Sequence, residues 1–270
     1  MNITPVVKQL LIINIIFFIG SQLVAPANDL FALSYFENNH FRFWQPLTHM
    51  FMHANVMHIA FNMFALYSFG STLEHFWGGK KFLFFYISCG LGAMLLHSMI
   101  DYFTVQNLLS NTLNLNLTKD ELHQIMNVKF DDGSRFYGNL FAEEIKPILE
   151  KGNKLNLLNE TNFKALFDSA VLENSKALGA SGAIYGLLVA FAFMFPSAQL
   201  GLMFIPVPIK AKYFVPGILA VDLFLGLKGS SIFGAGSTGI AHFAHLGGAL
   251  TGFIMMWYWK KNQFNKNRWN

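Results

Sequence analysis

The stretch Gly179-Ala-Ser181-Gly-Ala-Ile-Tyr185-Gly186 opens an apolar run that continues to Phe195. The Ser181 hydroxyl, a potential nucleophile, therefore lies at the start of a predicted membrane helix. Sixty-four positions after the serine, His245 opens another apolar stretch and is followed by Gly248 and Gly252. The sequence therefore offers a serine and a base at similar depth in two predicted helices.

The composition indicates a membrane protein, because 53% of the 270 residues are hydrophobic, 13% are charged and 30 are Phe. A soluble domain of this length would expose too much apolar surface to water. A bilayer core of about 30 Å needs about 20 helical residues, which predicts six spans, the fourth and fifth of them short. The windows are 6–25, 56–76, 82–103, 179–195, 213–228 and 241–259. We expect the first to be retained, because no small-residue cleavage site follows it.

Lysine and arginine residues in the short connections predict the orientation of the spans. One side would carry Lys8, Lys80, Lys81, Lys210, Lys212, Lys260, Lys261, Lys266 and Arg268. The short loops of the opposite side hold Arg42 and Lys228, with Asp29 and Glu37. We expect the basic side to be cytoplasmic, with both termini inside, and the protein to lie in a bacterial inner (plasma) membrane. The formal charge of +4 then reflects topology, not nucleic-acid binding.

Residues 104–177 break this pattern, because they contain 8 Lys/Arg and 10 Asp/Glu and no long apolar run. They predict a soluble, partly helical insertion on the outer face, between the third and fourth spans. Thr118-x-x-Glu121 resembles a capping box. Helical spacing follows at Phe163, Leu166, Phe167, Ala170 and Val171. The insertion either packs on the protein without a role in catalysis, or it controls the access of substrates or binds them.

The expected organisation has four parts: spans one to three in 1–103, the insertion in 104–177, spans four to six in 178–260 and a basic cytoplasmic tail in 261–270. The fold class is an all-α polytopic membrane protein with six transmembrane helices.

Polar residues inside the spans need hydrogen-bond partners or a water-filled cavity. Without either, placing each one in the membrane costs several kcal/mol. Ser181 and Tyr185 share a helix face at i, i+4, and His58 and Asn62 share another. Small-xxx-small faces let helix backbones approach closely, and two occur here, at Gly182 with Gly186 and at Gly248 with Gly252. We therefore expect His245 to come within hydrogen-bond reach of the Ser181 hydroxyl, which is a nucleophile and base arrangement.

An acyl transfer also needs donors for the developing oxyanion. The second span can supply the His58 imidazole and the Asn62 amide from one face. The Ser181 backbone N–H is a third donor, because the first N–H groups of a helix have no intrahelical acceptor.

These residues resemble the rhomboid intramembrane serine proteases in their bacterial six-helix form. The resemblance rests on four motifs and covers most of the chain outside the insertion. The motifs are Gly-Ala-Ser-Gly at 179–182 with Tyr185, Ala244-His245-Leu-Gly-Gly248-x-x-x-Gly252, His53-x-x-x-x-His58-x-x-x-Asn62 and Gly70-x-x-x-Glu74-x-x-x-Gly78.

The resemblance implies a six-helix bundle with a Ser181–His245 dyad, reached by water from the outer surface, and no third acid. Tyr185 would stack on the His245 ring, while His58, Asn62 and the Ser181 amide would form the oxyanion hole. Substrates would be transmembrane helices of other membrane proteins, cleaved in the lipid bilayer without a metal or cofactor. The oligomeric state stays open.

Three further residues carry separate expectations. Glu74 is predicted to be a structural hydrogen-bond acceptor. For Asp222, inside the fifth span, the simplest expectation is a stabilising bond to a neighbouring helix. Gln45 follows Trp44 where the family usually has Trp-Arg, which predicts a looser anchoring of the first outer loop.

Two alternatives belong to other functional classes. His49, His53, His58, His242 and His245 could form a zinc or copper site in a metal-binding membrane transporter. No His-Glu-x-x-His motif is present, and no carboxylate or thiolate is expected to join these histidines. The second alternative is an inactive relative that binds membrane helices.

Overall fold

The computed structural model describes residues 2–24, 26–133, 135–202, 205–228 and 241–262. The chain forms two compact units. The first comprises Met1–Ala32, Phe43–His97 and Ala177–Asn270, and the second comprises Leu33–Arg42 and Ser98–Lys176. The predicted basic tail lies outside the described residues from residue 263 on, including Lys266 and Arg268.

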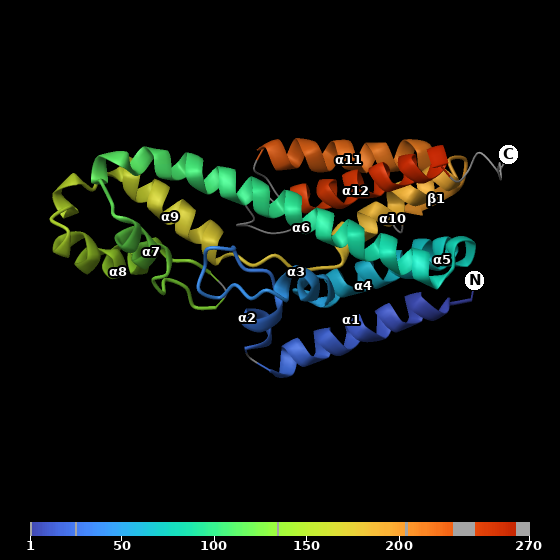
Figure 1. Cartoon of the computed structure of the whole chain (residues 1–270), viewed down its shortest axis with the longest axis horizontal. Helices are drawn as coiled ribbons and strands as arrows, with labels where there is room; N and C mark the ends of the chain where they lie inside the picture. Colours follow the sequence, from blue (N-terminus) through green and yellow to red (C-terminus); the bar gives the residue numbers. More distant parts are fainter. Residues whose placement is uncertain (1, 25, 134, 203–204, 229–240, 263–270) are drawn as a thin grey trace. The chain divides into compact units, whose positions relative to one another are not determined.

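The first unit is built from helices, which occupy each of the six predicted windows (Figure 1). They are α1 (Pro5–Leu23), α2 (Ala27–Phe31), α3 (Gln45–Thr48), η1 (His49–Phe51), α4 (Val56–Ala65), η2 (Leu66–Gly70), α5 (Ser71–Trp77), α6 (Gly79–Leu109), α10 (Ser181–Met194), α11 (Ala211–Lys228) and α12 (Ala241–Asn262). The α6 helix contributes to both units. Among the described residues, two helical segments are long and apolar enough to cross a membrane, Pro5–Leu23 and Gly79–Leu115. The all-α prediction is confirmed for these elements.

The α10 helix is the most enclosed helix of the first unit among those that the structure describes. Eight of its residues are buried: Gly182, Ala183, Ile184, Gly186, Leu187, Leu188, Val189 and Ala190. A helix that is apolar on all sides must be covered on all sides. It contacts α12, α11, α4, α5 and η2, so the helix that begins with Ser181 is held by several neighbours.

The Glu74 side chain joins α5 to the start of α1. Its carboxylate accepts hydrogen bonds from the Val6 N–H at 2.9 Å, the Val7 N–H at 2.8 Å and the Thr4 hydroxyl. The first N–H groups of a helix lack intrahelical acceptors, and a carboxylate there also suits the helix dipole. The predicted role of Glu74 as a structural acceptor is confirmed.

The loop after α1 is anchored by Trp44 and Gln45. Trp44 Nε1 donates to the Leu30 carbonyl at 2.8 Å, and Gln45 Nε2 donates to the Asp29 carbonyl at 3.0 Å. Gln45 is fully buried. The Gln45 amide thus reaches the loop backbone itself, and a looser anchoring than arginine would give stays a prediction.

A β-hairpin between α10 and α11 was not predicted. It pairs β1 (Gln199–Leu202) with β2 (Ile205–Lys210) in antiparallel register, with Gln199 opposite Lys210. The hairpin sets the start of α11, because the Ala211 N–H donates to the Ala198 carbonyl at 2.8 Å.

The second unit has its own hydrophobic core. Its described helices after α6 are η3 (Ser110–Leu115), α7 (Lys119–Met126), α8 (Gly138–Lys151), η4 (Leu155–Leu157) and α9 (Glu160–Asn174). The capping box predicted at Thr118 and Glu121 begins α7 and is confirmed. The apolar positions predicted in α9 face the core: Leu166 and Ala170 are buried in it, and Phe163, Phe167 and Val171 pack against it.

Glu173, near the end of α9, is a buried carboxyl group of the second unit, with 5% of its surface exposed. Burial, and secondarily the nearby Glu37, raise the pKa of Glu173 to about 7. Because the folded protein holds this proton more tightly than the unfolded chain, its contribution to stability is fully present below the unfolded pKa and is lost as pH rises toward 7.

We therefore expect Glu173→Gln to stabilise the protein at pH 8 but not at pH 5. A shift of this size corresponds to at most about 3 kcal/mol. Thermal melts of both proteins in detergent at the two pH values measure the effect. A stability difference that is the same at both pH values would contradict the assignment, because a lost packing contact does not titrate.

Candidate active site

The segment before Ser181 is fixed by its backbone. The Gly179 N–H donates to the His49 carbonyl at 2.9 Å, which ties the segment to η1. Gly179 has φ +125°, a conformation that side-chain-bearing residues rarely adopt. A Cβ at this position would also lie 2.8 Å from His58 Nε2. Glycine therefore lets the chain turn into α10 while the His58 ring stays close to it.

Ser181 and His245 are brought together by two helices whose backbones nearly touch. A Cβ on Gly248 would lie 1.9 Å from the Gly182 carbonyl oxygen, and a Cβ on Gly252 would lie 2.9 Å from the Gly186 Cα. At this separation of α10 and α12, His245 Nε2 is 2.9 Å from Ser181 Oγ. This is hydrogen-bond distance for an imidazole that accepts the hydroxyl proton.

The His245 ring is held in its plane by Tyr185. The two rings stack with centroids 4.2 Å apart and an interplanar angle of 9°. Because Tyr185 lies one turn after Ser181 on α10, the same helix presents the hydroxyl and the surface on which the imidazole rests. Stacking restricts the ring without occupying either of its nitrogens.

His58 and Asn62 lie on α4, which contacts α10. The Ala54 N–H donates to His58 Nδ1 at 3.4 Å. In a neutral imidazole the other nitrogen then carries the proton, so His58 Nε2, the atom beside Gly179, is a donor. Asn62 is buried, and within the described residues its Nδ2 group has no hydrogen-bond partner. Both side chains therefore keep an N–H group unused by the fold.

Asp222 was missed as a site residue. This buried residue of α11 places its Oδ1 atom 3.3 Å from His245 Nδ1 and in contact with His242 Nδ1. The expected bond to a neighbouring helix is confirmed. The expectation that no carboxylate joins the histidines was wrong. A signal was present in the sequence, because a carboxylate inside an apolar window needs a partner.

The ligand atoms of Asp222, His242 and His245 all lie within 4.8 Å of one another. Such a group has the composition and spacing of a three-ligand metal site. Among the described residues, His49, His53 and His58 form no comparable group. His53 instead meets the His58 ring edge to face, with centroids 5.0 Å apart.

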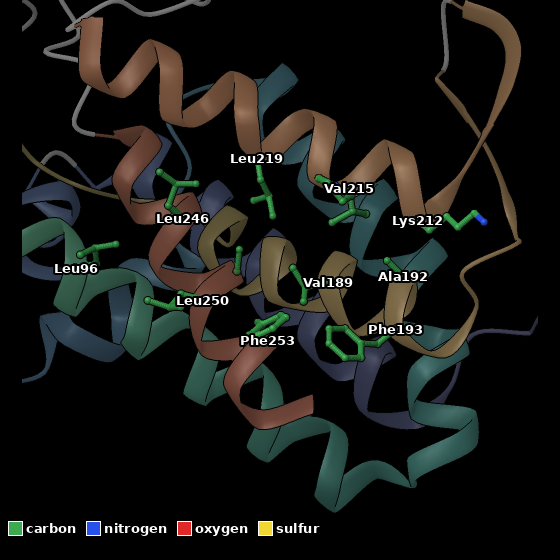
Figure 2. A pocket seen from close by; sticks show the side chains of 12 residues that line it. Leu96, Val189, Ala192, Phe193, Lys212, Val215, Leu219, Leu246, Leu250 and Phe253 are labelled. Carbon is green, nitrogen blue, oxygen red and sulfur yellow. The ribbon is translucent and has the colours of Figure 1, made fainter. Parts of the chain in front are cut away.

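A separate apolar pocket of about 610 Å³ lies between α10, α11 and α12 (Figure 2). Its lining is hydrophobic apart from Lys212, and includes Val189, Leu219 and Leu250. Neither Ser181 nor His245 lines it. The pocket therefore offers space for hydrocarbon, with Lys212 as the one charged residue of its lining.

Comparison with known proteins identifies the family. A model of the Rhomboid domain matches residues 40–107 and 158–262. An uncharacterized mitochondrial rhomboid protein of Schizosaccharomyces pombe is 25% identical over 178 residues, 65% of this chain and 41% of that protein. Rhomboid protease GluP of Bacillus subtilis is 38% identical over 48 residues, 18% of this chain and 10% of that protein.

The matched regions thus span less than half the length of either relative. The family model, however, covers more than half of this chain and includes Ser181, His245, His58 and Asn62. It confirms the resemblance drawn from the motifs. The chain belongs to the rhomboid family of membrane proteins.

Proposed function

We propose that this protein is an intramembrane serine endopeptidase that cleaves transmembrane helices of other membrane proteins. Ser181 is the nucleophile and His245 is the base. The observation that carries the proposal is the 2.9 Å distance between His245 Nε2 and Ser181 Oγ. A serine hydroxyl is weakly acidic and attacks a carbonyl only when a base takes its proton.

The reaction follows from this pair. Ser181 Oγ attacks the scissile carbonyl carbon as its proton passes to His245 Nε2. The tetrahedral intermediate collapses when the C–N bond breaks, and the leaving amine takes the proton from His245. Water, activated by the same nitrogen, then hydrolyses the acyl ester and restores the serine. Tyr185 keeps the imidazole oriented through both proton transfers.

Three N–H groups are proposed to stabilise the oxyanion: His58 Nε2, Asn62 Nδ2 and the Ser181 amide. The unused His58 and Asn62 donors support this role. Ser181 is the first residue of α10, so its N–H lies at the positive end of the helix dipole.

We expect His58→Ala and Asn62→Ala each to lower kcat by about 10²–10³, because each removes one oxyanion donor. Steady-state cleavage of a transmembrane reporter in detergent measures the effect. Asn14→Ala is the matched control, since Asn14 is an equally buried amide whose Nδ2 is bonded to the Leu10 carbonyl within α1. Folded His58 and Asn62 variants that cleave as fast as the Asn14 variant would place both side chains outside the oxyanion hole.

Six membrane-spanning helices, with both termini on the cytoplasmic side, are part of the same proposal. Glu74 of α5 bonds to the first residues of α1, and Lys81 Nζ lies 4.1 Å from the Trp259 ring centroid. These contacts gather the ends of α1, α5, α6 and α12 at one side of the first unit, which supports a common basic face. The outer position of residues 104–177 and a bacterial inner-membrane location stay predictions.

A serine-directed fluorophosphonate tests the proposed nucleophile directly. The detergent-solubilised protein is incubated with the probe, digested and analysed by mass spectrometry. We expect covalent labelling at Ser181. Absence of labelling at Ser181 in a folded sample that is supplied with an active control enzyme would favour the inactive relative.

Metal binding is a second candidate function, because Asp222, His242 and His245 form a three-ligand group. Equilibrium dialysis against Zn²⁺ distinguishes the two candidates. A metal carrier binds about one Zn²⁺ per chain and loses it in Asp222→Asn, whereas the protease is labelled by fluorophosphonate in the presence of a chelator.

A further inference from the structure

The Asp222 carboxylate is the one charged group of α11 that is buried among the described residues, with 5% of its surface exposed. A carboxylate at membrane depth costs several kcal/mol unless it is paired. Its partners include two residues of α12, His242 and His245, which share one face at i, i+3. The position of Asp222 is therefore fixed by the helix that carries the proposed base.

Close packing of α11 on α12 makes this contact possible. Gly226 lies one turn after Asp222 on the same face of α11. A Cβ on Gly226 would lie 3.1 Å from Phe243 Cε2 and 3.4 Å from His242 Cβ. A larger residue would push the start of α12 away. The glycine brings both histidines within reach of the short aspartate side chain.

The His245 ring is thereby engaged at both of its nitrogens. Nε2 is 2.9 Å from Ser181 Oγ, and Nδ1 is 3.3 Å from Asp222 Oδ1. An ionised carboxylate can only accept hydrogen bonds, so Nδ1 is the nitrogen that carries the proton. Nε2 then has a free lone pair toward the serine, which is the tautomer that a general base requires.

We propose that Asp222 is a positioning residue for His245, so that this protein works with a serine, histidine and aspartate rather than with a serine and histidine alone. The inference rests on the proposed function. Asp222 selects the Nδ1–H tautomer and, once Nε2 has taken the serine proton, its negative charge stabilises the imidazolium. The aspartate does not touch substrate and takes up no proton.

His242 shares the same carboxylate oxygen and holds Asp222 in place. In the tautomer in which both Nδ1–H groups donate to Oδ1, a metal ion could bind these two nitrogens only by displacing both protons. In that tautomer the three side chains form a hydrogen-bonded cluster rather than a metal site. His242 also supplies the matched control, because it contacts the same oxygen but has no contact with Ser181 among the interactions described.

The test compares wild type, Asp222→Asn and His242→Gln. Asparagine keeps the shape and an acceptor oxygen but loses the charge. We expect Asp222→Asn to lower kcat, and the rate of fluorophosphonate labelling at Ser181, by about 10²- to 10⁴-fold, with little change in KM. His242→Gln leaves the Asp222 charge beside His245 and is expected to lower both rates much less.

Two results would overturn the proposal. One is an Asp222→Asn protein with wild-type kcat and labelling rate. The other is an equal loss in both variants, accompanied by an equal fall in their thermal midpoints, which is the signature of a purely structural contact. If wild type itself is not labelled at Ser181, the proposed function fails, and that outcome is separate from either of these.

A measurement on the wild-type protein covers the case in which Asp222→Asn does not fold. Nitrogen NMR of protein with ¹⁵N-labelled histidine reports which ring nitrogen carries the proton, and His245→Ala assigns the signal. We expect Nδ1 of His245 to be protonated and Nε2 to be unprotonated at neutral pH. A proton on Nε2 alone would overturn the assignment of Asp222.

Discussion

Replacing Ser181 by alanine, or His245 by alanine, is expected to abolish cleavage of a transmembrane reporter. Each change removes one half of the hydrogen-bonded pair at 2.9 Å. Residues that act as a unit lose about 10⁴- to 10⁶-fold in kcat when either is removed. For the same reason, the double variant should be no slower than either single variant. Reporter cleavage in detergent, followed by gel densitometry, measures all three.

Folding controls and chelators complete this test. Ser181→Ala removes no buried charge, so its thermal midpoint should stay close to that of wild type. His245→Ala also removes one partner of the buried Asp222 carboxylate and is expected to melt at a lower temperature. A chelator in excess should leave the wild-type rate unchanged. Persistent cleavage by Ser181→Ala, or loss of wild-type activity on removal of zinc, would exclude the serine and histidine pair as the source of the activity.

The helices of the first unit could be predicted because long apolar windows indicate segments that avoid water. The ends of these helices were predicted less accurately. The α6 helix continues to Leu109, six residues past the predicted limit of 103. Residues 104–109 are more polar than the window before them, yet nothing in them breaks a helix. An apolar window marks the part of a helix that lies in an apolar environment. The helix can continue beyond that window for as long as its backbone hydrogen bonds continue.

The hairpin of β1 and β2 was missed for a different reason. Its second strand contains Pro206 and Pro208, and proline in a run of apolar residues normally argues against a strand. The argument is weaker here, because both strands of a two-stranded sheet are edge strands. On the unpaired side of an edge strand, a missing N–H costs no ladder bond.

The contact between Ser181 and His245 was predictable because spacing on each helix is a local property. The glycines at i, i+4 on α10 and α12 indicated which faces would meet. The contact between Asp222 and His245 could not be predicted from such spacing. Asp222 lies on a third helix, α11, which approaches α12 closely at Gly226. A contact between residues of three helices depends on how the helices pack together. The repeat of residue types along a single helix does not reveal that packing.

The close approach of α10 and α12 leads to the second large prediction, that Gly248→Ala inactivates the protein. The added Cβ would lie 1.9 Å from the Gly182 carbonyl oxygen and 2.6 Å from its carbonyl carbon. These are backbone atoms, so no side chain can rotate away, and the helices must separate. Separation would draw His245 away from Ser181, and overpacking of this kind costs about 1–3 kcal/mol or more.

Gly217→Ala is the matched control, because Gly217 lies within α11 and a Cβ there would meet nothing within 4 Å. Alanine is a better helix former than glycine by about 1 kcal/mol, so this variant should be as stable as wild type or more so. We expect Gly248→Ala to melt at a lower temperature and to lose both reporter cleavage and fluorophosphonate labelling. If instead it melts lower but is labelled at the wild-type rate, then the proximity of Ser181 and His245 does not depend on the glycine contact. The reactive geometry would in that case be maintained by the Tyr185 stack and by Asp222.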